Sequence, residues 1–557
     1  MLLLVVAVLL AACQGPTAVL KQADRVAIDL VEAQQRQLGI EEGFSLLPAR
    51  QQLRRELLGE QALCVVQEVS PEGAGLTLTL MQALEVGAAN SRSYQLQKEG
   101  VFQAALALDL ERDAFRSSWQ GVLSGLWSTD NGGRERVTGL TGQADGGLQK
   151  TLRSGASFAL SVGLDLVQLL TGERVMSRGI VADSSIRIPL LRGAGAEVVT
   201  EPLQQAERDV LYALLNFERY KRTFAVEIAS TYLQVLEDNN QVKTAWDNYQ
   251  RLSVACQRAR RLADAGRLPE VQVDQALQDE LRARNSWVRA RQNSLDSLDR
   301  FKLDLGLPTD AAIVLDDHEL ARLQQGLATA GVLKPPEDTA AATEDSSLLT
   351  TALRQRCDLR VARERIVDRQ RAIRVAEDAL QTELTLLGSG QAGGRRTLSQ
   401  AGEEDARLRP HRGSYSALLT LDLPLERTAE RNALRNSWIA YEQSRRDSEA
   451  LEDQVKYQVR SARRQVVEAR ETIRIQKQAL EVARRRVAAT DLFLRAGRIQ
   501  MRDVLEAQDA LVVAANALVA AQVQYAIAGM ELQRDLGSLN PDAEGNWLRA
   551  IFEGALL

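Results

Sequence analysis

The chain has 557 residues, a formal net charge of −5 and an aromatic content of only 4%. Few aromatic residues together with abundant Ala, Leu, Gln, Glu and Arg are typical of long helices, and they argue against a string of compact globular cores. The small net charge, spread over both signs, also excludes the basic surface that a nucleic-acid-binding protein needs.

The sequence opens with an unbroken apolar run, residues 2–12, which is too short to span a bilayer. The run ends in Leu10-Ala11-Ala12-Cys13, small residues before a cysteine, and so resembles the lipobox of bacterial lipoproteins. We therefore predict a signal peptide at residues 1–12, a lipid-modified Cys13 and an N-terminal mature segment at 13–75. The alternative is an ordinary signal peptide in which Cys13 is incidental, and both alternatives predict export.

A helix is predicted from Thr79 to about Arg116, followed by a β region at about 117–190. Apolar and small or polar residues alternate over residues 158–167, and this period of two over about nine residues suits a strand that crosses a bilayer. Trp119 and Trp127, at either end of another segment, favour a membrane interface. A strand of a soluble sandwich would show the same alternation.

A helical hairpin is then predicted at about 203–306, and it completes a first repeat at 76–310. Val210, Phe217 and Phe224 recur every seven residues along its first helix. About 60 residues at a rise of 1.5 Å make this helix roughly 90 Å long, which a soluble globular core does not need. Gly266 lies in the turn before the return helix.

A linker at 311–347 leads to a second repeat at 348–540, and residues 541–557 form a C-terminal tail. The second repeat predicts a helix at 348–379, a β region at about 381–424 and a helical hairpin at about 425–537. Residues 415–423 alternate as a strand does, and the glycine-rich stretch 388–413 predicts an exposed loop between paired strands. The long helix carries a coiled-coil seam at Val455, Val459, Ala462, Val466, Ala469, Ile473, Leu480, Ala483 and Val487.

The two repeats match without a gap over the 42 positions 265–306, at an offset of 231 residues, and twelve of these positions are identical. The match begins in an Ala-Gly-Arg turn and ends in a Leu-Gly pair in each repeat. Because an ungapped match fixes helix length, the two copies must build the same hairpin. Two long repeats suggest a symmetric assembly.

Residues for catalysis or metal binding are scarce. The sequence has two histidines, His318 and His411, both in predicted loops, and its four cysteines show no C-x-x-C spacing. No nucleotide-binding or hydrolase motif is complete. We therefore predict no enzyme activity, no cofactor and no metal site.

The order helix, β-hairpin, long helix, glycine turn and return helix, stated twice, resembles the outer-membrane efflux protein family typified by TolC. The resemblance covers about residues 76–540. The motifs that carry it are the Pro-Leu-Leu-Arg-Gly run at 189–193, the two Ala-Gly-Arg turns, the Asp-Val-Leu-Glu-Ala run at 503–507 and the two Leu-Gly endings. It implies a mainly α fold with a membrane β-barrel portion. Each protomer of a homotrimer would give four strands to a 12-stranded β-barrel and its helices to a periplasmic α-helical barrel.

The resemblance also implies a function. The chain would be the outer-membrane channel of a tripartite efflux or type I secretion system, a passive conduit from a periplasmic adaptor and an inner-membrane pump to the exterior. It would lie in the bacterial outer membrane and extend into the periplasm. The alternative is an exported coiled-coil structural lipoprotein that conducts nothing, which explains the heptads but not the alternating strands at matching points of both repeats.

The family's periplasmic gate pattern falls on Asp503 and Glu506, which lie one helical turn apart on one face. In a trimer they would form two acidic rings that attract cations. The alternative is a capping box with Asp503 as N-cap and Glu506 at N3. The first repeat has Gln272 and Gln275 at the equivalent positions, so acid is expected from one hairpin only.

The turns between the long helices are the expected contacts with the adaptor. The residues concerned are Gly266, Arg267, Gly497 and Arg498. Glycine at a helix C-cap explains the same turns without any partner, and both explanations can hold together.

Overall fold

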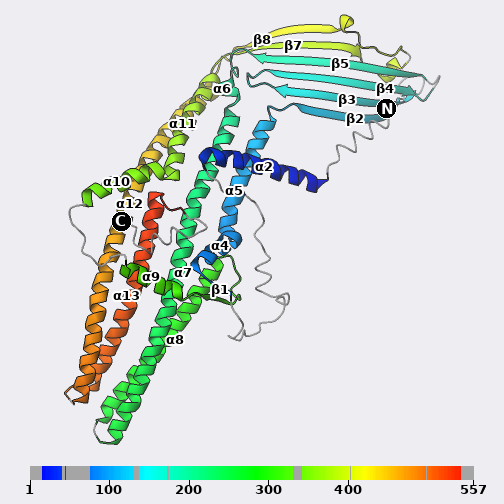
Figure 1. The fold of residues 1–557 in the computed structure, drawn as a ribbon. Helices are drawn as coiled ribbons and strands as arrows, with labels where there is room; N and C mark the ends of the chain where they lie inside the picture. The colour runs from blue at the N-terminus through cyan, green and yellow to red at the C-terminus, as the bar shows by residue number, and fades with distance from the viewer. Residues whose placement is uncertain are drawn as a thin grey trace. The chain divides into compact units, whose positions relative to one another are not determined.

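The computed structural model describes residues 15–39, 44, 76–130, 137–171, 175–266, 268–329, 341–401, 403–496 and 498–540. The chain divides into two compact units (Figure 1). The sheet unit comprises residues 1–44, 101–213 and 362–448, and the hairpin unit comprises residues 45–100, 214–361 and 449–557. Each unit combines segments of both repeats, so the units do not coincide with the repeats.

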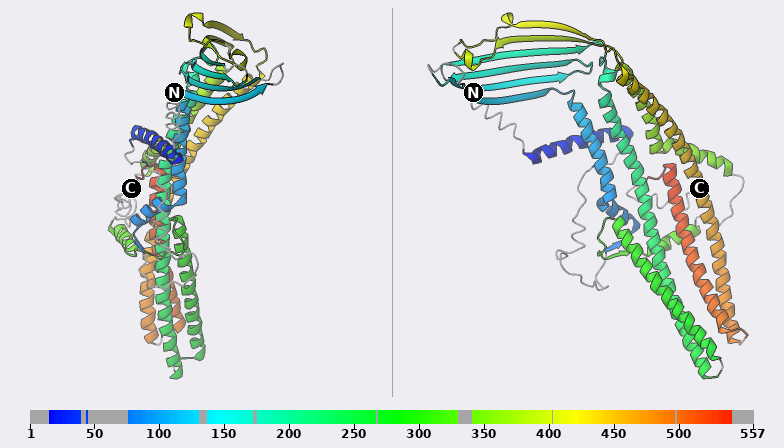
Figure 2. Two further views of the ribbon diagram at one scale, coloured as in Figure 1. Left: turned by 90° about the vertical axis from the view of Figure 1, so that its right-hand side faces the viewer. Right: turned by 180° about the vertical axis from the view of Figure 1, so that it is seen from behind.

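The sheet unit is built on six antiparallel strands in the order β2-β3-β4-β5-β7-β8 (Figure 2). The strands are β2 (Ser118–Asp130), β3 (Val137–Thr151), β4 (Ser157–Leu169), β5 (Met176–Pro189), β7 (Glu383–Gly394) and β8 (Ser414–Asp422). The four strands per protomer implied by the resemblance are therefore too few. The first β region is long enough for two hairpins with 13–15-residue strands, whereas the second holds one.

Helices join the strands to the rest of the chain. The sheet unit contains α2 (Pro16–Leu38) and α6 (Ala196–Val199), and four further helices contribute residues to both units: α5 (Arg92–Asp113), α7 (Glu201–Asp264), α11 (Cys357–Asp378) and α12 (Thr428–Arg495). Helix α2, in the segment to which the sequence assigned no element, has an amphipathic pattern that buries Ala27 and Val31.

Within the sheet unit, buried polar contacts fix α7 against α11. Tyr212 donates a hydrogen bond from its hydroxyl to Asp368 at 2.5 Å, and Arg208 Nε lies 2.8 Å from the other oxygen of the same carboxylate. Arg371 pairs with Glu201 at 2.8 Å one turn away. Because each buried charge has an oppositely charged partner, the helices can pack beside the strands without an isolated charge.

The two helices predicted to precede the strands are each broken once. The first is α4 (Leu80–Asn90) followed by α5, and the second is α10 (Ala341–Gln355) followed by α11. At each break the Leu-Gly ending of the same repeat approaches closely. A Cβ on Gly306 would overlap the backbone carbonyl of Asn90, and one on Gly537 would lie 3.2 Å from the carbonyl of Gln355. Close backbone approach thus explains both glycines.

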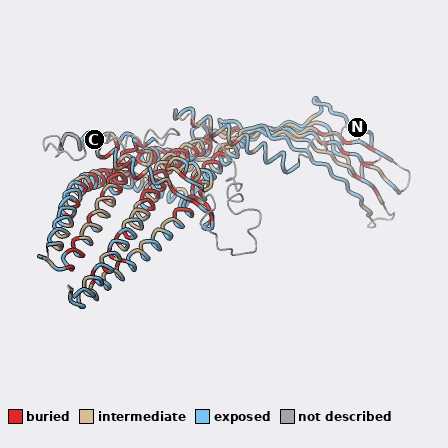
Figure 3. Tube along the Cα trace, turned by 60° about the horizontal axis from the view of Figure 1, so that its bottom comes forward, coloured by how far each residue is buried: buried red, intermediate tan, exposed pale blue. Residues whose placement is uncertain are grey.

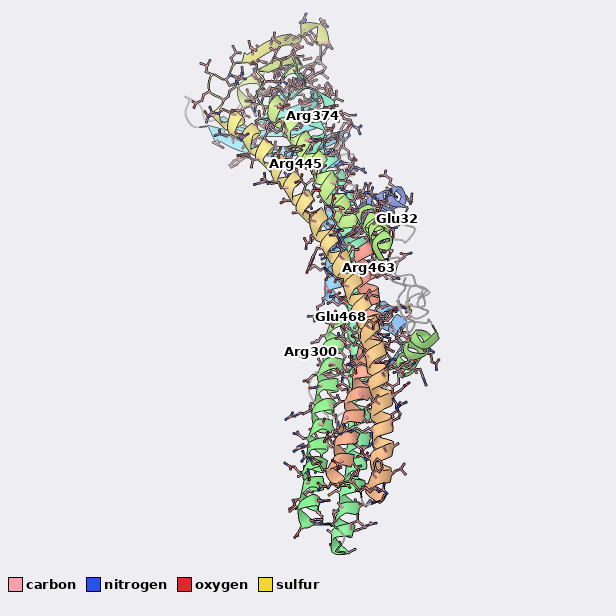
Figure 4. All side chains as sticks on the ribbon, turned by 90° about the vertical axis from the view of Figure 1, so that its left-hand side faces the viewer. Glu32, Arg300, Arg374, Arg445, Arg463 and Glu468 are labelled. Carbon is pink, nitrogen blue, oxygen red and sulfur yellow. The ribbon has the colours of Figure 1, made fainter. Side chains whose placement is uncertain are left out.

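The hairpin unit is held by the predicted seams. Return helices α8 (Glu270–Asp304) and α13 (Met501–Leu536) follow α7 and α12. The described seam of α12 is buried from Val455 to Ala483, apart from the half-buried Gln476, and Val487 is half-buried. Figure 3 shows buried positions recurring along the helices, and charged residues such as Arg300 and Glu468 lie on exposed positions (Figure 4). The predicted seams are confirmed.

Two features distinguish the first repeat within the hairpin unit. Tyr94 packs its ring against Phe217 and Phe224, with centroids 5.4 Å and 5.1 Å away. A small parallel pair of strands, β1 (Leu76–Leu78) with β6 (Ile313–Leu315), precedes α9 (His318–Thr329). His318 therefore begins a helix rather than lying in a loop.

Candidate functional site: the two-faced sheet, its distal loop and the helical tips

One face of the sheet is apolar across neighbouring strands. Side chains alternate between the faces of a strand, so residues that pair directly share a face. Trp119 of β2 pairs with Leu148 of β3, and Leu148 pairs with Leu160 of β4. On β4 the predicted alternation is confirmed, since its apolar side chains are 37–42% exposed. They are Phe158, Leu160, Val162, Leu164 and Leu166.

The opposite face carries polar residues on all six strands. One continuous row of paired residues crosses all six strands and carries amide, hydroxyl and carboxylate groups with a single glycine between them. The row consists of Gln120, Gly147, Ser161, Asp183, Gln391 and Ser414. Asp145 and Asp165 lie on the same face. Asp145 is two residues before Gly147 on β3, and Asp165 is four residues after Ser161 on β4. A sheet with one apolar and one polar face is what a water-filled membrane barrel requires.

Both edges of the sheet are open. Strands β2 and β8 each pair with one neighbour only within the described residues, and all nine residues of β8 are exposed. Unpaired backbone groups cannot face lipid, because nothing in the hydrocarbon layer can accept or donate a hydrogen bond. The sheet of a single copy is therefore incomplete as a membrane-spanning structure.

The loop between β7 and β8 differs from its prediction. Residues 388–394 belong to β7, and residues 395–396 and 405–406 contact the sheet on its polar face. Residues 407–412 are exposed, as predicted. Arg395 Nη2 lies 2.8 Å from Asp145 Oδ1, and Arg395 Nη1 lies 3.4 Å from Asp165 Oδ1. The loop includes the short helices η1 (Leu398–Gln400) and η2 (Pro410–Arg412), which contains His411.

The acidic residues of the second hairpin lie on the exposed side of α13. Asp503 and Glu506 are exposed, whereas Val504, Leu505 and Ala507 between and beside them are buried. Asp503 accepts a hydrogen bond from the backbone N–H of Gln500 at 3.1 Å. Gln500 is thus the N-cap and Asp503 occupies N3, which corrects the expected capping box by one turn.

Glu506 has a partner that the sequence did not suggest. Its Oε1 accepts a hydrogen bond from Arg486 Nη2 of α12 at 3.0 Å. Both side chains are about half exposed, with 47% exposure for Arg486 and 60% for Glu506, so the pair is screened by solvent. The contact ties the two helices of the hairpin together close to its tip.

Asp509 is a third acidic residue of α13 beside the two predicted ones, and the sequence prediction did not include it. It follows Glu506 at the same spacing of three residues, and its Oδ1 accepts a hydrogen bond from Asn248 at 3.5 Å. Partial burial raises the pKa of the Asp509 carboxyl, and the hydrogen bond from Asn248 lowers it in part. The recurrence of acids at 503, 506 and 509 was the available signal, whereas Asn248 lies 261 residues away.

The tips of the hairpins are described in part. Gly266 is exposed, has φ of +70° and follows the end of α7, so it acts as the predicted glycine C-cap. Arg498 is exposed, and its backbone N–H donates to Phe493 O at 3.0 Å. Arg267 and Gly497 lie outside the described residues, as do Cys13 and the predicted signal peptide at 1–12.

Residues from both hairpins share one apolar cluster near these tips. Leu252 and Cys256 of α7, Ala276 of α8 and Met501 and Leu505 of α13 are all buried in it. Cys256 therefore serves as a small packing residue, and burial raises the pKa of its thiol. Among the described residues no group of His, Cys, Asp and Glu is arranged to hold a metal ion.

The chain is similar to known proteins at two levels. Residues 348–538 match the family model described as outer membrane efflux protein. No curated protein sequence matches the chain. Among solved structures, CusC superposes with a TM-score of 0.58 at 13% identity, covering 85% of this chain and 96% of that one.

Two further channels show the same likeness. VceC from Vibrio cholerae has a TM-score of 0.57 at 12% identity, covering 82% of this chain and 96% of that one. CmeC from Campylobacter jejuni has a TM-score of 0.54 at 12% identity, covering 88% and 94%. At these identities the likeness establishes the fold alone, and the family match over the second repeat adds a likeness of sequence. Residues 348–538 are thus similar in sequence to the outer membrane efflux protein family, and the chain shares the fold of these channel structures.

Proposed function

We propose that the chain is the outer-membrane channel of a tripartite efflux or type I secretion system. It would be a passive conduit that receives its cargo from a periplasmic adaptor and an inner-membrane pump. The observation that carries this proposal is the six-stranded sheet with one apolar face, one polar face and two open edges, in the same chain as two long helical hairpins. An exported structural coiled coil would have no use for such a sheet.

The open edges support closure by copies of the same chain. Because strand direction alternates through the sheet, β8 of one copy and β2 of the next run antiparallel when copies are arranged around a ring. Every edge is then paired, as a bilayer demands. In a homotrimer, six strands per copy give a barrel of 18 strands, in place of the 12 that the resemblance implied.

The hairpin tips would serve the periplasmic side. Gly266, Arg267, Gly497 and Arg498 would meet the adaptor, and Asp503 and Glu506 would line the periplasmic gate. In each copy Asp503 is engaged as a helix cap and Glu506 is paired with Arg486. Opening of the gate would therefore exchange the Glu506–Arg486 pair for another contact. Export and anchoring would depend on residues 1–12 and on lipidation of Cys13.

The channel is tested by reconstitution. Full-length protein is extracted in detergent, its oligomeric state is measured, and the oligomer is added to planar lipid bilayers. We expect stepwise conductance from a trimer. A water-soluble oligomer that gives no conductance would overturn the proposal and would favour the structural lipoprotein.

The gate and the anchor have separate tests. Replacing Asp503 and Glu506 together with Ala should weaken block of the channel by multivalent cations, and Asp274→Ala in the first hairpin is the matched control. Unchanged block would reject the gate. For the anchor, mass spectrometry of the mature protein should find an acylated N-terminal Cys13, and Cys13→Ser should remove the lipid.

A further inference from the structure

We propose that the β7–β8 loop, residues 395–413, is a built constriction at the outer mouth of the channel, held in place by an ionic clasp between Arg395 and the acidic residues Asp145 and Asp165. This inference rests on the proposed function, in which the polar face of the sheet lines the lumen. The loop lies on that face and would therefore lie inside the pore.

The clasp depends on a buried carboxylate. The side chain of Asp165 has no solvent exposure, and its two oxygens face Arg395 Nη1 at 3.4 Å and the backbone N–H of Arg396 at 3.2 Å. The other terminal nitrogen of Arg395, Nη2, lies 2.8 Å from Asp145 Oδ1. Departure of the loop would break both contacts and expose the Asp165 carboxylate to the water of the lumen. The charge-assisted hydrogen bonds from Arg395 and Arg396 therefore favour the inward position.

Two glycines make room for the loop. Gly139 of β3 and Gly179 of β5 lie on the polar face of the sheet. An added Cβ would overlap the side chain of Leu398 at Gly139 and would lie 2.8 Å from the backbone nitrogen of Arg396 at Gly179. A loop that extended into solvent would not require the absence of side chains at these two positions.

The return part of the loop is attached as well. The backbone N–H of Arg178, near the start of β5, donates to Asp405 Oδ1 at 2.9 Å, and the N–H of Ala406 donates to the carbonyl of Arg178 at 2.8 Å. Ala401 between the two attachments is fully buried. The loop is thus attached to the sheet at residues 395–396 and again at residues 405–406.

The topology sets the end of the barrel at which the loop lies. Strand β7 begins five residues after α11, and β8 ends six residues before α12, so the loop joins the ends of the strands that are remote from the helices. With the helices in the periplasm, those ends face the exterior. Three inward loops in one ring would narrow the outlet, and each constriction of a pore adds its resistance in series.

The first test removes the loop. Single-channel conductance of the full-length oligomer is compared with that of a variant in which a short Gly-Ser linker replaces residues 396–411. We expect conductance to rise by roughly half or more, because the outlet and the proposed periplasmic gate conduct in series and the resistance of the outlet is removed. Arg395→Ala should raise it in the same direction, whereas Arg36→Ala, at an exposed arginine of α2 outside the loop, should leave it unchanged.

The second test displaces the loop without altering it. Gly179→Val puts a side chain where the loop backbone lies and should raise conductance. Gly142→Val is the matched control. Gly142 belongs to β3 and lies on the apolar face of the sheet, away from the loop, and an added Cβ there meets nothing closer than 3.9 Å. Each variant is first checked for the heat-resistant oligomer, so that a folding defect is recognised. The variants that form this oligomer then decide whether the loop constricts the pore.

The outcomes separate the two proposals. If the natural chain conducts and neither the loop replacement nor Arg395→Ala nor Gly179→Val changes its conductance, the constriction is wrong and the channel stands. If the natural chain forms no conducting oligomer, the proposed function fails first.

Discussion

At the scale of single residues, the buried Arg356 at the junction of α10 and α11 connects several helices of the hairpin unit. The side chain of Arg356 is only 1% exposed and reaches Asp358 with two nitrogens, at 2.7 Å and 3.1 Å. A third nitrogen donates to Gln458 of α12 at 2.6 Å, and Arg219 of α7 lies 2.5 Å from the same carboxylate. Arg356 and Asp358 therefore connect α7, α11 and α12 in the hairpin unit.

Removing Arg356 should destabilise the protein strongly. In Arg356→Met the guanidinium is lost while the half-buried Asp358 keeps its charge with one partner fewer, so we expect a loss of roughly 3 kcal/mol in the free energy of unfolding. Denaturant unfolding of the detergent-solubilised protein measures it. The control is Arg374→Met, whose arginine is 67% exposed and pairs with the exposed Glu197. That variant should change stability by less than about 1 kcal/mol, and equal losses would contradict the role of burial.

The same junction should make stability depend on pH. Burial alone would raise the pKa of Asp358, but the hydrogen bond from Arg356 and the charges of Arg219 and Arg356 outweigh it, and the pKa is lowered. The stabilisation is therefore complete above the unfolded value of about 4 and is lost as the pH falls through the lower folded value. Unfolding experiments at neutral and acidic pH should show the difference between the natural chain and Asp358→Asn shrinking below about pH 4. A difference that grows on acidification would reverse the assigned sign.

At the scale of elements, each return helix ends against the break between the first two helices of its own repeat, α4 and α5 or α10 and α11. Gly306 and Gly537 both have φ of +76° and both lie against the backbone at a break, next to Asn90 in one repeat and Gln355 in the other. The breaks are stabilised differently, by the aromatic cluster around Tyr94 in the first repeat and by the Arg356 network in the second. The duplicated hairpins thus keep their geometry while their packing chemistry has diverged.

Replacing Gly306 with alanine should lower the free energy of unfolding by more than the addition of one methyl group suggests. Gly306→Ala adds a Cβ in the left-handed region, which costs roughly 1–2 kcal/mol, and the same Cβ overlaps the backbone carbonyl of Asn90. The loss of unfolding free energy should therefore exceed the conformational cost alone.

The control for Gly306→Ala is Gly100→Ala in the interior of α5. An added Cβ at Gly100 meets nothing within 4 Å. Because alanine loses less conformational freedom than glycine on entering a helix, this variant should gain about 0.5–1 kcal/mol. Thermal unfolding of the two variants should shift in opposite directions, and a neutral Gly306→Ala would refute the docking role.

At the scale of the whole molecule, the exposed apolar face of the sheet fits the assembly proposed above. A single copy leaves two edges open and exposes the apolar face, including Trp119 at 78% and Trp127 at 65%. Aromatic residues near both ends of β2 fit the two interfaces of a bilayer. Insertion and closure would cover the face with lipid and pair the edges together.

A charge on this face should impair insertion. Leu164 lies in the middle of β4 on the apolar face, so Leu164→Arg should cost roughly 2–4 kcal/mol in the bilayer and reduce the amount of heat-resistant oligomer in outer membranes. Ser161→Arg, on the polar face of the same strand, is the control and should insert normally. Equal insertion of both variants would contradict the assignment of the faces.

The sequence determined those features that depend on neighbours along the chain. A period of two identified β4 and β8, a period of seven identified the buried seam of α12, and the ungapped repeat identified two equal hairpins. It also placed Asp503 and Glu506 on one side of α13, because positions three residues apart share a helix face.

The tertiary structure alone decided what depends on distant residues. Six strands instead of four, the breaks at Ser91 and Arg356, the pairing of Glu506 with Arg486 and the inward loop all required it. Arg395 meets Asp145 across 250 residues of sequence. Periodicity records which face of an element is apolar, because that is set by adjacent turns and pleats. It does not record which distant partner satisfies a charge or how many strands a β region holds, because the fold as a whole brings those groups together.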